Sequence, residues 1–312
     1  MKYIVIGEPC VDLIHKTDGN VIHSYGGVLY SVISLSVLAA KKDDVICPVM
    51  NLGADEYDNI TGILKKYPNI NTEGIYKVAH PTRKVNLYYD LYNSGKSARM
   101  ETSTEPTYTI DYKSIEKFLP EADAVLVNMI SGVDITLDTL KSIRKNFGGF
   151  MHIDIHNLVM KTNPDGTREH TNLENWREWC SNTNTVQMNE FEVTTLSRSK
   201  KIEYEVIGEV LINMNANVTG IIITRGKNGV SGFTRQEKVF GNEKFFDLDK
   251  DDVSAVESPH FVDSTGCGDV FAASFTLDFS KNGNFRKSLH YATRIASFNT
   301  SLEGINELHK LR

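Results

Sequence analysis

The stretch that decides the fold is Asp263–Asp269, with the sequence DSTGCGD, followed at once by the apolar run VFAASF. The apolar residues 260–262 before it predict a short strand, and the apolar run after it predicts a helix. Glycines let the backbone turn tightly, and the first N–H groups of a helix have no partner inside the helix. Such a turn can therefore hold an anion, with help from the positive end of the helix dipole.

A carboxylate repels phosphate, so the presence of Asp269 at the end of an anion-binding turn requires a chemical explanation. Taking the proton from a hydroxyl group that attacks a phosphoryl group would be such a reason. The simpler alternative is an ordinary strand-to-helix turn in which an aspartate caps the helix.

The composition is that of an ordinary globular protein. The chain has 312 residues, of which 40% are hydrophobic and 24% charged, and its formal net charge is −6. It has no long basic run, so sequence-independent binding of nucleic acid is not expected. No stretch reaches the roughly 20 apolar residues that a membrane helix needs. The N-terminus is expected to form a first strand rather than a signal peptide.

The four cysteines, Cys10, Cys47, Cys180 and Cys267, lie far apart and form no C-x-x-C pair. A zinc site or a disulfide framework is therefore not expected, and reduced thiols in a cytoplasmic protein fit better.

Short apolar runs alternate with longer helix-like segments along most of the chain. This order predicts an α/β fold with a mainly parallel sheet and helices on both faces. Strands are expected at residues 3–6, 45–50, 124–128, 150–155, 185–188 and 220–224. Helices are expected at 28–40, 56–67, 137–146, 173–180, 203–214, 268–279 and 285–300. A hairpin is expected from the strand-like residues 230–233 and 238–240.

Residues 75–109 differ from the rest of the chain. They are rich in Tyr, Thr and Val, and polar and apolar side chains alternate, as in KVNLYYDLY at 84–92. This period-two pattern predicts a small antiparallel sheet that projects from the main body. No linker is visible, so we expect one domain, 1–312, with a β lid formed by parts of residues 12–25 and 75–109.

The DSTGCGD stretch resembles the D-T-x-G-A-G-D signature of the PfkB (ribokinase-like) family of carbohydrate and nucleoside kinases. Ser264 and Cys267 replace the common Thr and Ala and are small enough for the same turn. The resemblance implies that Asp269 is the catalytic base. It also implies that the backbone amides of Gly266, Cys267 and Gly268 form an anion hole.

The resemblance extends to two cation sites. The sequence NEFE at 189–192 is similar to the family's N-x-x-E motif, which implies that Asn189 and Glu192 serve Mg²⁺ near the phosphates. They would act through water, because Mg²⁺ keeps several waters and takes few protein ligands. The alternative for this stretch is a helix N-terminus rich in acids. The family's monovalent-cation site uses the loop that starts at the first aspartate, which makes Asp263 and Thr265 candidates for binding potassium.

The sequence TRGKNG at 224–229 resembles the family's T-x-G-x-x-G nucleotide loop. The resemblance implies that Thr224, Gly226 and Gly229 contact ATP. A hairpin turn before the strand-like residues that follow is the alternative interpretation.

On the substrate side, the family has an aspartate that binds substrate hydroxyls and then a di-glycine that lets the sugar approach the backbone. Asp12, Gly26 and Gly27 match this order. Family members commonly carry Asn a few residues after the di-glycine, whereas this chain has Tyr30 near that position. An aromatic side chain there would either stack on a ring or fill the pocket.

His152, Asp154 and His156 alternate along a predicted strand and therefore share one face. They could form a transition-metal site, although a polar strand end beside an active site is the more common outcome. Asp154 with Asn157 would match an aspartate and an asparagine that the family often has there. The long polar segment 161–172 is unusual.

The order of the motifs along the chain also matches the family, so the resemblance implies a ribokinase-like fold and an ATP-dependent phosphotransferase that uses Mg²⁺. The expected acceptor is an alcohol group of a sugar or sugar-like molecule. A nucleoside or vitamin-precursor kinase is the first alternative, and a non-catalytic ligand-binding member is the second. A nucleotide-binding oxidoreductase would need G-x-G-x-x-G after the first strand, where the chain has only GEP. Family members often dimerise through the lid, which implies a homodimer.

Overall fold

A computed structural model describes residues 1–15, 19–39, 43–89, 99–196, 202–213, 217–241, 243–258 and 260–312. Residues 16–18 and 90–98 of the expected lid therefore lie outside the described residues, as do residues 40 and 214, at which two helices are predicted to end. No helix in the described ranges is long and apolar enough to cross a bilayer.

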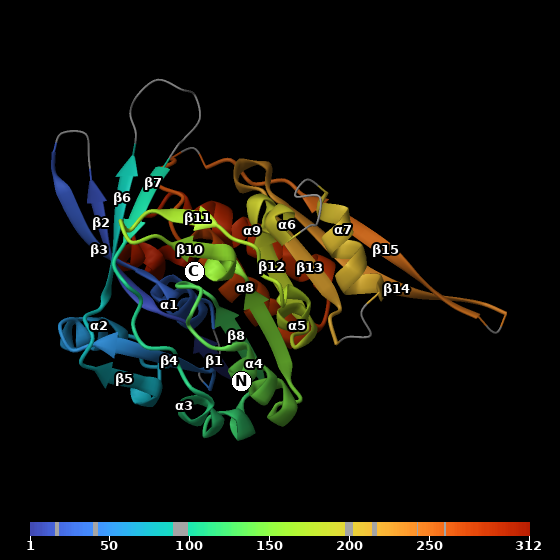
Figure 1. The fold of residues 1–312 in the computed structure, drawn as a ribbon, viewed down its shortest axis with the longest axis horizontal. Coiled ribbons are helices and arrows are strands. Elements are labelled where there is room, and N and C mark those ends of the chain that lie inside the picture. The colour runs from blue at the N-terminus through green and yellow to red at the C-terminus, as the bar shows by residue number, and fades with distance from the viewer. Residues whose placement is uncertain are drawn as a thin grey trace.

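A large sheet runs through the molecule in the order β15-β14-β13-β12-β9-β8-β1-β4-β5 (Figure 1). The seven strands from β13 to β5 are parallel to their neighbours, whereas β14 and β15 are antiparallel additions. The predicted mainly parallel sheet is thereby confirmed. The strands are β1 (Lys2–Ile6), β4 (Val45–Gly53), β5 (Ile75–Val78), β8 (Ala124–Asn128), β9 (Phe150–Asp154), β12 (Thr185–Asn189), β13 (Gly220–Thr224), β14 (Val230–Phe240) and β15 (Glu243–Val253).

Helices cover both faces of this sheet, because its strands are apolar on both sides. Tyr3 and Val5 of β1 pack into one hydrophobic core, whereas Ile4 and Ile6 pack into the other. The first core contains α1 (Val28–Leu38), α2 (Tyr57–Leu64), α8 (Cys267–Asn282) and α9 (Phe285–Asn299). The second contains α3 (Tyr112–Glu116), α4 (Leu137–Asn146), α5 (Trp176–Ser181), α6 (Glu190–Leu196) and α7 (Glu203–Gly208).

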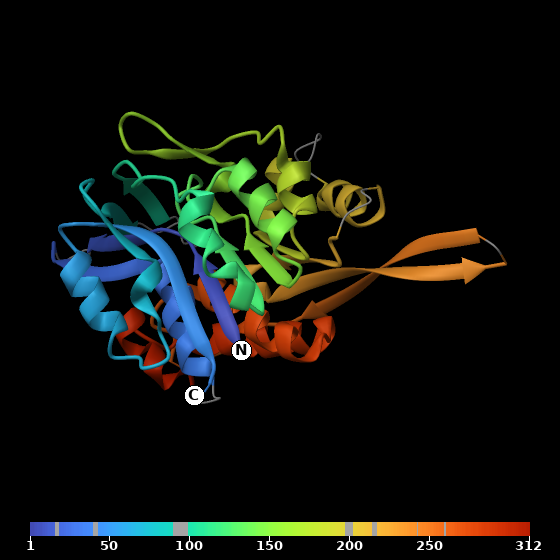
Figure 2. The same ribbon diagram turned by 90° about the horizontal axis from the view of Figure 1, so that it is seen from below.

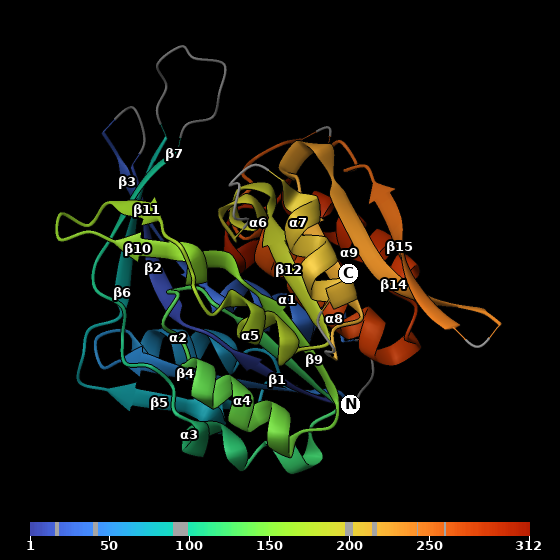
Figure 3. The same cartoon turned by 45° about the vertical axis from the view of Figure 1, so that its right-hand side comes forward.

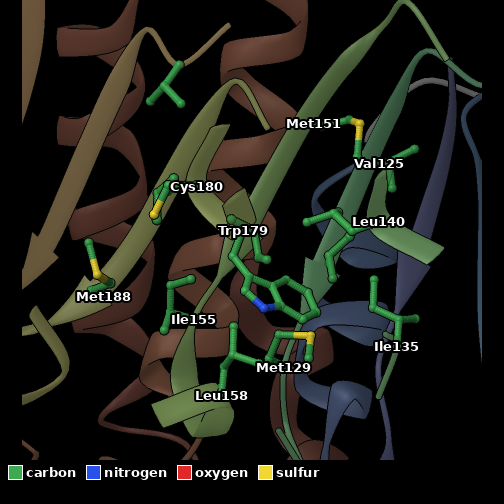
Figure 4. Packing of buried hydrophobic residues seen from close by; sticks show 14 of the residues in the cluster. Val125, Met129, Ile135, Leu140, Met151, Ile155, Leu158, Trp179, Cys180 and Met188 are labelled. Atoms are coloured by element: carbon green, nitrogen blue, oxygen red, sulfur yellow. The ribbon is translucent and has the colours of Figure 1, made fainter. Parts of the chain in front are cut away.

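The two helical layers lie on opposite sides of the sheet in Figure 2. Figure 4 shows part of the second core, with Trp179, Met129 and Leu140 among its members. Short 3₁₀ turns complete the described helices, at Thr72–Gly74, Leu119–Glu121, His156–Val159, Gly226–Asn228 and Ile305–Leu311, and a π-helical turn follows α7 at Glu209–Asn213.

A second, small sheet of four strands stands at one end of the molecule, in the order β3-β2-β6-β7 (Figure 1). Its β2–β3 and β6–β7 pairs are antiparallel, while β2 and β6 are parallel. Its strands are β2 (Pro9–His15), β3 (Val21–Gly27), β6 (Arg83–Tyr89) and β7 (Arg99–Ser103). Residues 75–78 of the range expected for the lid instead form β5, at the edge of the large sheet.

The unusual polar segment after β9 forms a two-stranded hairpin of β10 (Met160–Thr162) and β11 (Arg168–His170). This hairpin reaches the small sheet, as Figure 3 shows. The backbone N–H of Ser103 in β7 donates to the carbonyl of Gly166 over 3.1 Å. Thr102 and Thr167 form an isolated antiparallel β-bridge. The hairpin is therefore attached to the outer edge of the small sheet.

Two expectations for the C-terminal third of the chain are wrong. Residues 260–262 form no strand, because no strand in the described part of the chain pairs with them; Phe261 is 69% exposed and Val262 50% exposed. Residues 230–233 and 238–240 are not two strands of a hairpin but parts of one strand, β14, which pairs with β15 along its whole length. Polar residues occupy the middle of β14 because the β14–β15 arm extends beyond the body, where no face has to be buried (Figure 2).

Candidate active site

A cleft of about 1390 Å³ is lined by the carboxyl ends of several parallel strands, the start of α8 and the inner face of the small sheet. This volume exceeds that of a pocket for one small ligand, roughly 300–1,000 Å³. Most of the predicted site residues meet in this cleft. Gly26 and Asp263 are the exceptions. The lining includes Asp12, Gly27, Tyr30, Asn189, Glu192, Thr224, Gly226, Gly229, Thr265, Gly266, Cys267, Gly268 and Asp269.

The glycine turn places the N-terminus of α8 inside the cleft. Gly266 is the residue that precedes the helix, and its φ of 74° is left-handed, a conformation that glycine adopts without strain. The first helical amides, beginning at Cys267, have no partner four residues earlier within the helix. The amide of Cys267 makes one long bond of 3.2 Å to the carbonyl of Ser264. The turn therefore presents backbone amides and the positive helix end to the cleft.

Asp269 lies in the first turn of α8 and is only 8% exposed. The Asn128 side-chain amide, at the end of β8, donates to its Oδ1 over 2.6 Å. The same amide nitrogen lies 3.1 Å from the hydroxyl of Ser31, which donates to the backbone carbonyl of Asp269. Asn128 thus holds the carboxylate in a fixed orientation, a role that the sequence analysis missed.

A second buried carboxylate, Asp154, stands at the end of β9. Burial raises the pKa of Asp154 well above its ordinary value, and the charges of Glu192 and Asp269 raise it further. The Gln187 side-chain amide donates to Asp154 Oδ2 over 3.0 Å and to the carbonyl of Gly268 over 3.1 Å. Gln187, also missed from sequence, therefore connects Asp154 to the glycine turn.

His152, Asp154 and His156 do not form a metal site. His152 is fully buried, with Nδ1 2.8 Å from Thr185 Oγ1 and Nε2 3.4 Å from Gln187 Oε1, and it does not line the cleft. Burial lowers its pKa to about 4. Within the described ranges, no group of three His, Cys, Asp or Glu residues is placed to hold a metal ion.

Asn189 and Glu192 bond to each other at the start of α6. Asn189 donates from its backbone N–H to Glu192 Oε2 over 2.7 Å and from its side chain to Oε1 over 2.6 Å. In return, Asn189 Oδ1 accepts from the amide of Glu192 over 2.9 Å, which completes a reciprocal helix cap. Burial raises the pKa of Glu192 to about 8; the Asn189 amide opposes this shift and the Asp269 charge adds to it.

The glycine loop after β13 is fixed at both ends. The Arg225 Nη2 donates to both carboxylate oxygens of Glu203 in α7, over 2.7 and 2.8 Å. Gly229 has a φ of +89°, and a β-carbon there would lie 2.0 Å from the carbonyl oxygen of Val253. Gly226 also has a positive φ, but the space around it is open. The loop is thus held against α7 and β15, with Thr224 and Gly226 facing the cleft.

Asp12 and the di-glycine come together on adjacent strands, β2 and β3. A β-carbon on Gly26 would lie 2.1 Å from Asp12 Oδ2, so this glycine makes room for the carboxylate. Gly27 has a φ of 62° and precedes α1. Tyr30, in the first turn of α1, is buried with its ring against Gly266, so it fills space beneath the glycine turn.

Hydrogen bonds within the loop and from α9 hold the loop that contains Asp263 and Thr265. Asp263 Oδ1 accepts from the amide of Thr265 over 3.1 Å, and Asn299 donates to the carbonyl of Thr265 over 3.3 Å. Thr265 lines the cleft beside the glycine turn, whereas Asp263 does not.

Two arginines with buried side chains also line the cleft, although the sequence did not predict them as site residues. Arg83 lies on β6 and Arg168 on β11, and both line the cleft, as Asp12 on β2 does. Neither belongs to a motif, so only their position in the fold reveals them.

Solved structures of several kinases share this fold. A ribokinase from Thermotoga maritima is 18% identical, covers 100% of this chain and 98% of its own, and has a TM-score of 0.67. A Burkholderia thailandensis nucleoside kinase in complex with inosine is 14% identical (99% and 96% covered, TM-score 0.73). A fructokinase with bound ATP from Xylella fastidiosa is also 14% identical (99% and 97% covered, TM-score 0.73). At these identities the likeness establishes the ribokinase-like fold.

A search of curated proteins finds no match. The family model described as pfkB family carbohydrate kinase matches residues 154–310, which include β12, the glycine loop after β13 and the DSTGCGD turn. The match covers half of the chain, and the fold comparison agrees with it. The chain therefore belongs to the pfkB family of carbohydrate kinases.

Proposed function

We propose that the protein is an ATP-dependent kinase that transfers the γ-phosphoryl group to a hydroxyl of a sugar or sugar-like small molecule. The observation that carries this proposal is Asp269, a buried carboxylate directly beside a glycine turn at the start of a helix, inside a large cleft. Phosphoryl transfer calls for this pair of features, because the acceptor hydroxyl loses a proton while negative charge sits on the transferred group.

In the proposed reaction, Asp269 takes the proton as the hydroxyl attacks the γ-phosphoryl group in line, and ADP leaves as the bond from the bridging oxygen to the γ-phosphorus breaks. Asn128 keeps the carboxylate aimed at the hydroxyl through its 2.6 Å hydrogen bond. The amides of Gly266, Cys267 and Gly268 stabilise the charge on the transferred group. The small sheet, as a lid, excludes water, which would otherwise compete as an acceptor.

The nucleotide is proposed to lie along the glycine loop, against Thr224, Gly226 and Gly229. Asn189 and Glu192 fit a Mg²⁺ site, because hard oxygen ligands suit this ion and a cation would stabilise the ionised form of Glu192, whose pKa is raised to about 8. Mg²⁺ supplies neutralisation of phosphate charge when bound, with these residues acting through water. Asp263 and Thr265 stay the proposed potassium ligands.

The remaining expectations are proposals of the same kind. Asp12, Gly26 and Gly27 would bind acceptor hydroxyls, with Tyr30 beneath them. A nucleoside or vitamin-precursor acceptor and a non-catalytic ligand-binding role are the competing functions. Action in the cytoplasm and a homodimer formed through the small sheet are also predictions.

The decisive experiment compares the wild type with Asp269→Asn in a phosphoryl-transfer assay over a panel of sugars and nucleosides, with ATP and with pyrophosphate as donors. We expect turnover to fall by about 10²–10⁴-fold, the usual effect of losing a general base. Binding of ATP, measured by calorimetry, should persist because the carboxylate is not a nucleotide contact in this proposal.

Asp138→Asn is the matched control, because Asp138 also lies in the first turn of a helix but is exposed on α4. It should leave turnover unchanged. Near-normal turnover in Asp269→Asn would exclude Asp269 as the base. A panel without any turnover, despite binding of a small molecule, would instead support the non-catalytic alternative.

A further inference from the structure

The β10–β11 hairpin places a charged side chain at the acceptor end of the cleft. Its strand β11 begins at Arg168, directly after the residues that bond to β7. Arg168 Nη1 forms an ion pair with Glu101, which lies on β7. Both side chains line the cleft. The polar segment 161–172 thus contributes to the wall of the cleft through Arg168.

Arg168 is joined there by a second buried guanidinium. The Arg83 side chain is 2% exposed and the Arg168 side chain 7%. Arg83 donates to the carbonyl of Ile130 over 3.2 Å and to Ser103 Oγ over 3.1 Å, and its Nη1 lies 3.7 Å from Glu8 Oε2. Within the described residues, neither arginine has a partner for every one of its N–H groups.

The Nε atoms of Arg83 and Arg168 are both buried and have no hydrogen-bond partner among the described residues. A buried donor without a partner is unfavourable, and two neighbouring positive charges repel each other. Burial lowers the pKa of Arg168; the charge of Glu101 opposes this shift, whereas that of Arg83 adds to it. An added acceptor group with negative charge would relieve both problems.

The order of the strands places both arginines on one side of Asp12, the aspartate proposed to bind hydroxyls. Asp12 lies on β2, Arg83 on the next strand, β6, and Glu101 on β7, with Arg168 beyond it. Neighbouring strands are about 4.8 Å apart, so β2 and β7 are roughly 10 Å apart. That span matches a small sugar derivative, with its hydroxyls at Asp12 and another group at the arginines.

We propose that the phosphate acceptor carries an anionic group, a carboxylate or a phosphate ester, which Arg168 and Arg83 bind on the side of Asp12 that faces β7. The planar guanidinium fits both anions with paired hydrogen bonds, which a hydroxyl cannot match. The carboxylate of Asp12 would repel the anionic group of the acceptor, so that group binds at the arginines and not at Asp12. This inference rests on the proposed kinase function, because only a kinase has a phosphate acceptor.

The test is a set of paired ligands that differ in charge. Calorimetry without nucleotide compares D-gluconate with D-glucose, and D-fructose 6-phosphate with D-fructose. We expect at least one anion to bind about tenfold or more tightly than its neutral partner, a ratio that corresponds to about 1.4 kcal/mol. The first pair reports a carboxylate site and the second a phosphate site.

Variants then assign the preference to Arg168. Arg168→Gln should abolish the difference between charged and neutral ligands. Arg168→Lys should retain part of it, because the charge and the ion pair with Glu101 survive while the planar fork is lost. Arg286→Gln is the control, since Arg286 on α9 is 76% exposed and does not line the cleft. Thermal unfolding identifies a variant that fails to fold, in which case Arg168→Lys decides.

Three results would overturn the inference: neutral ligands that bind as tightly as their anionic partners, an anion preference that survives in Arg168→Gln, or no binding by either anion. Because these measurements use no nucleotide, they are independent of turnover. Anion-dependent binding without phosphoryl transfer would contradict the proposed function and leave the anion site standing.

Discussion

The ring of Tyr30 occupies the space that a side chain on Gly266 would need. A β-carbon built on Gly266 would lie 2.3 Å from Cδ1 of Tyr30, and the φ of Gly266 is +74°. The glycine turn at the start of α8 therefore depends on α1 as well as on its own sequence. Any residue larger than glycine would have to displace a buried aromatic ring from beneath the proposed anion hole.

Gly266→Ala should accordingly lower the free energy of unfolding by more than Gly283→Ala. Both glycines flank α8 with positive φ, but nothing lies within 4 Å of a β-carbon at Gly283. The left-handed backbone costs about 1–2 kcal/mol in either variant, and overpacking adds about 1–3 kcal/mol at Gly266 alone. Urea unfolding measures the difference. Equal losses in the two variants would show that Tyr30 moves aside freely.

Asn128→Ala should slow phosphoryl transfer without weakening nucleotide binding. Its amide is the donor that orients Asp269, at 2.6 Å, and losing a buried hydrogen bond to a charged group costs about 1.5–3 kcal/mol. We expect turnover to fall by about 10–100-fold. Asn146→Ala provides the comparison, because Asn146 is exposed and its side chain donates to a carbonyl in its own helix. A decrease below twofold in Asn128→Ala would remove this positioning role.

Stability should fall in acid partly because of His152. Burial lowers the pKa of this histidine to about 4, whereas in an unfolded chain the value is about 6.5. Between these pH values the unfolded state binds the proton more readily than the folded state. The contribution of neutral His152 to the free energy of unfolding is therefore complete above pH 6.5 and is lost as the pH falls toward 4. The slope is at most about 1.4 kcal/mol per pH unit.

His152→Gln should remove this part of the slope, because glutamine keeps hydrogen-bonding groups but does not titrate in this range. The measurement is the free energy of unfolding in urea at several pH values from 4 to 8. Parallel curves for the wild type and the variant would contradict the prediction.

The Arg225–Glu203 pair should support the nucleotide loop. Both side chains are about four-fifths buried, and the bonds of 2.7 and 2.8 Å run from one guanidinium nitrogen to both carboxylate oxygens. Arg225→Lys should weaken ATP binding, because the loop loses part of its attachment to α7. A double-mutant cycle with Glu203→Gln, read out by calorimetry, should give a coupling of about 1 kcal/mol. Additive effects would mean that the pair does not act through this contact.

Much of the central sheet could be predicted from the sequence, because its strands are short apolar runs bounded by polar residues. Ala124–Asn128 and Gly220–Thr224 match their predicted ranges, and so does the helix Leu137–Asn146. Residues 260–262 have the same apolar pattern but no neighbouring strand, and a pattern cannot reveal whether a partner is present. The polar middle of β14 was mistaken for a turn for a related reason, since the sequence does not show that this arm leaves the body.

The candidate site was predictable only where its residues belong to local motifs. Asp269 and the glycine turn lie within seven consecutive residues, so sequence alone indicates their chemistry. Asn128 acts on a residue 141 positions away, and Gln187 on one 81 positions away. Arg83 and Arg168 meet only because the small sheet and the β10–β11 hairpin join. Such partnerships depend on the assembled fold and leave no short-range signal.

The attachment of the β10–β11 hairpin to β7 has a consequence for how substrates enter and leave. If the small sheet moved outward, its bonds to the hairpin would make Arg83 and Arg168 move together relative to Asp269, which lies on α8. Such a movement would break the hydrogen bond from Arg83 to the carbonyl of Ile130. An acceptor bound by the two arginines would then move toward Asp269 when the small sheet closes and away from it when the sheet opens. Recognition of the acceptor would thereby be coupled to the timing of proton removal.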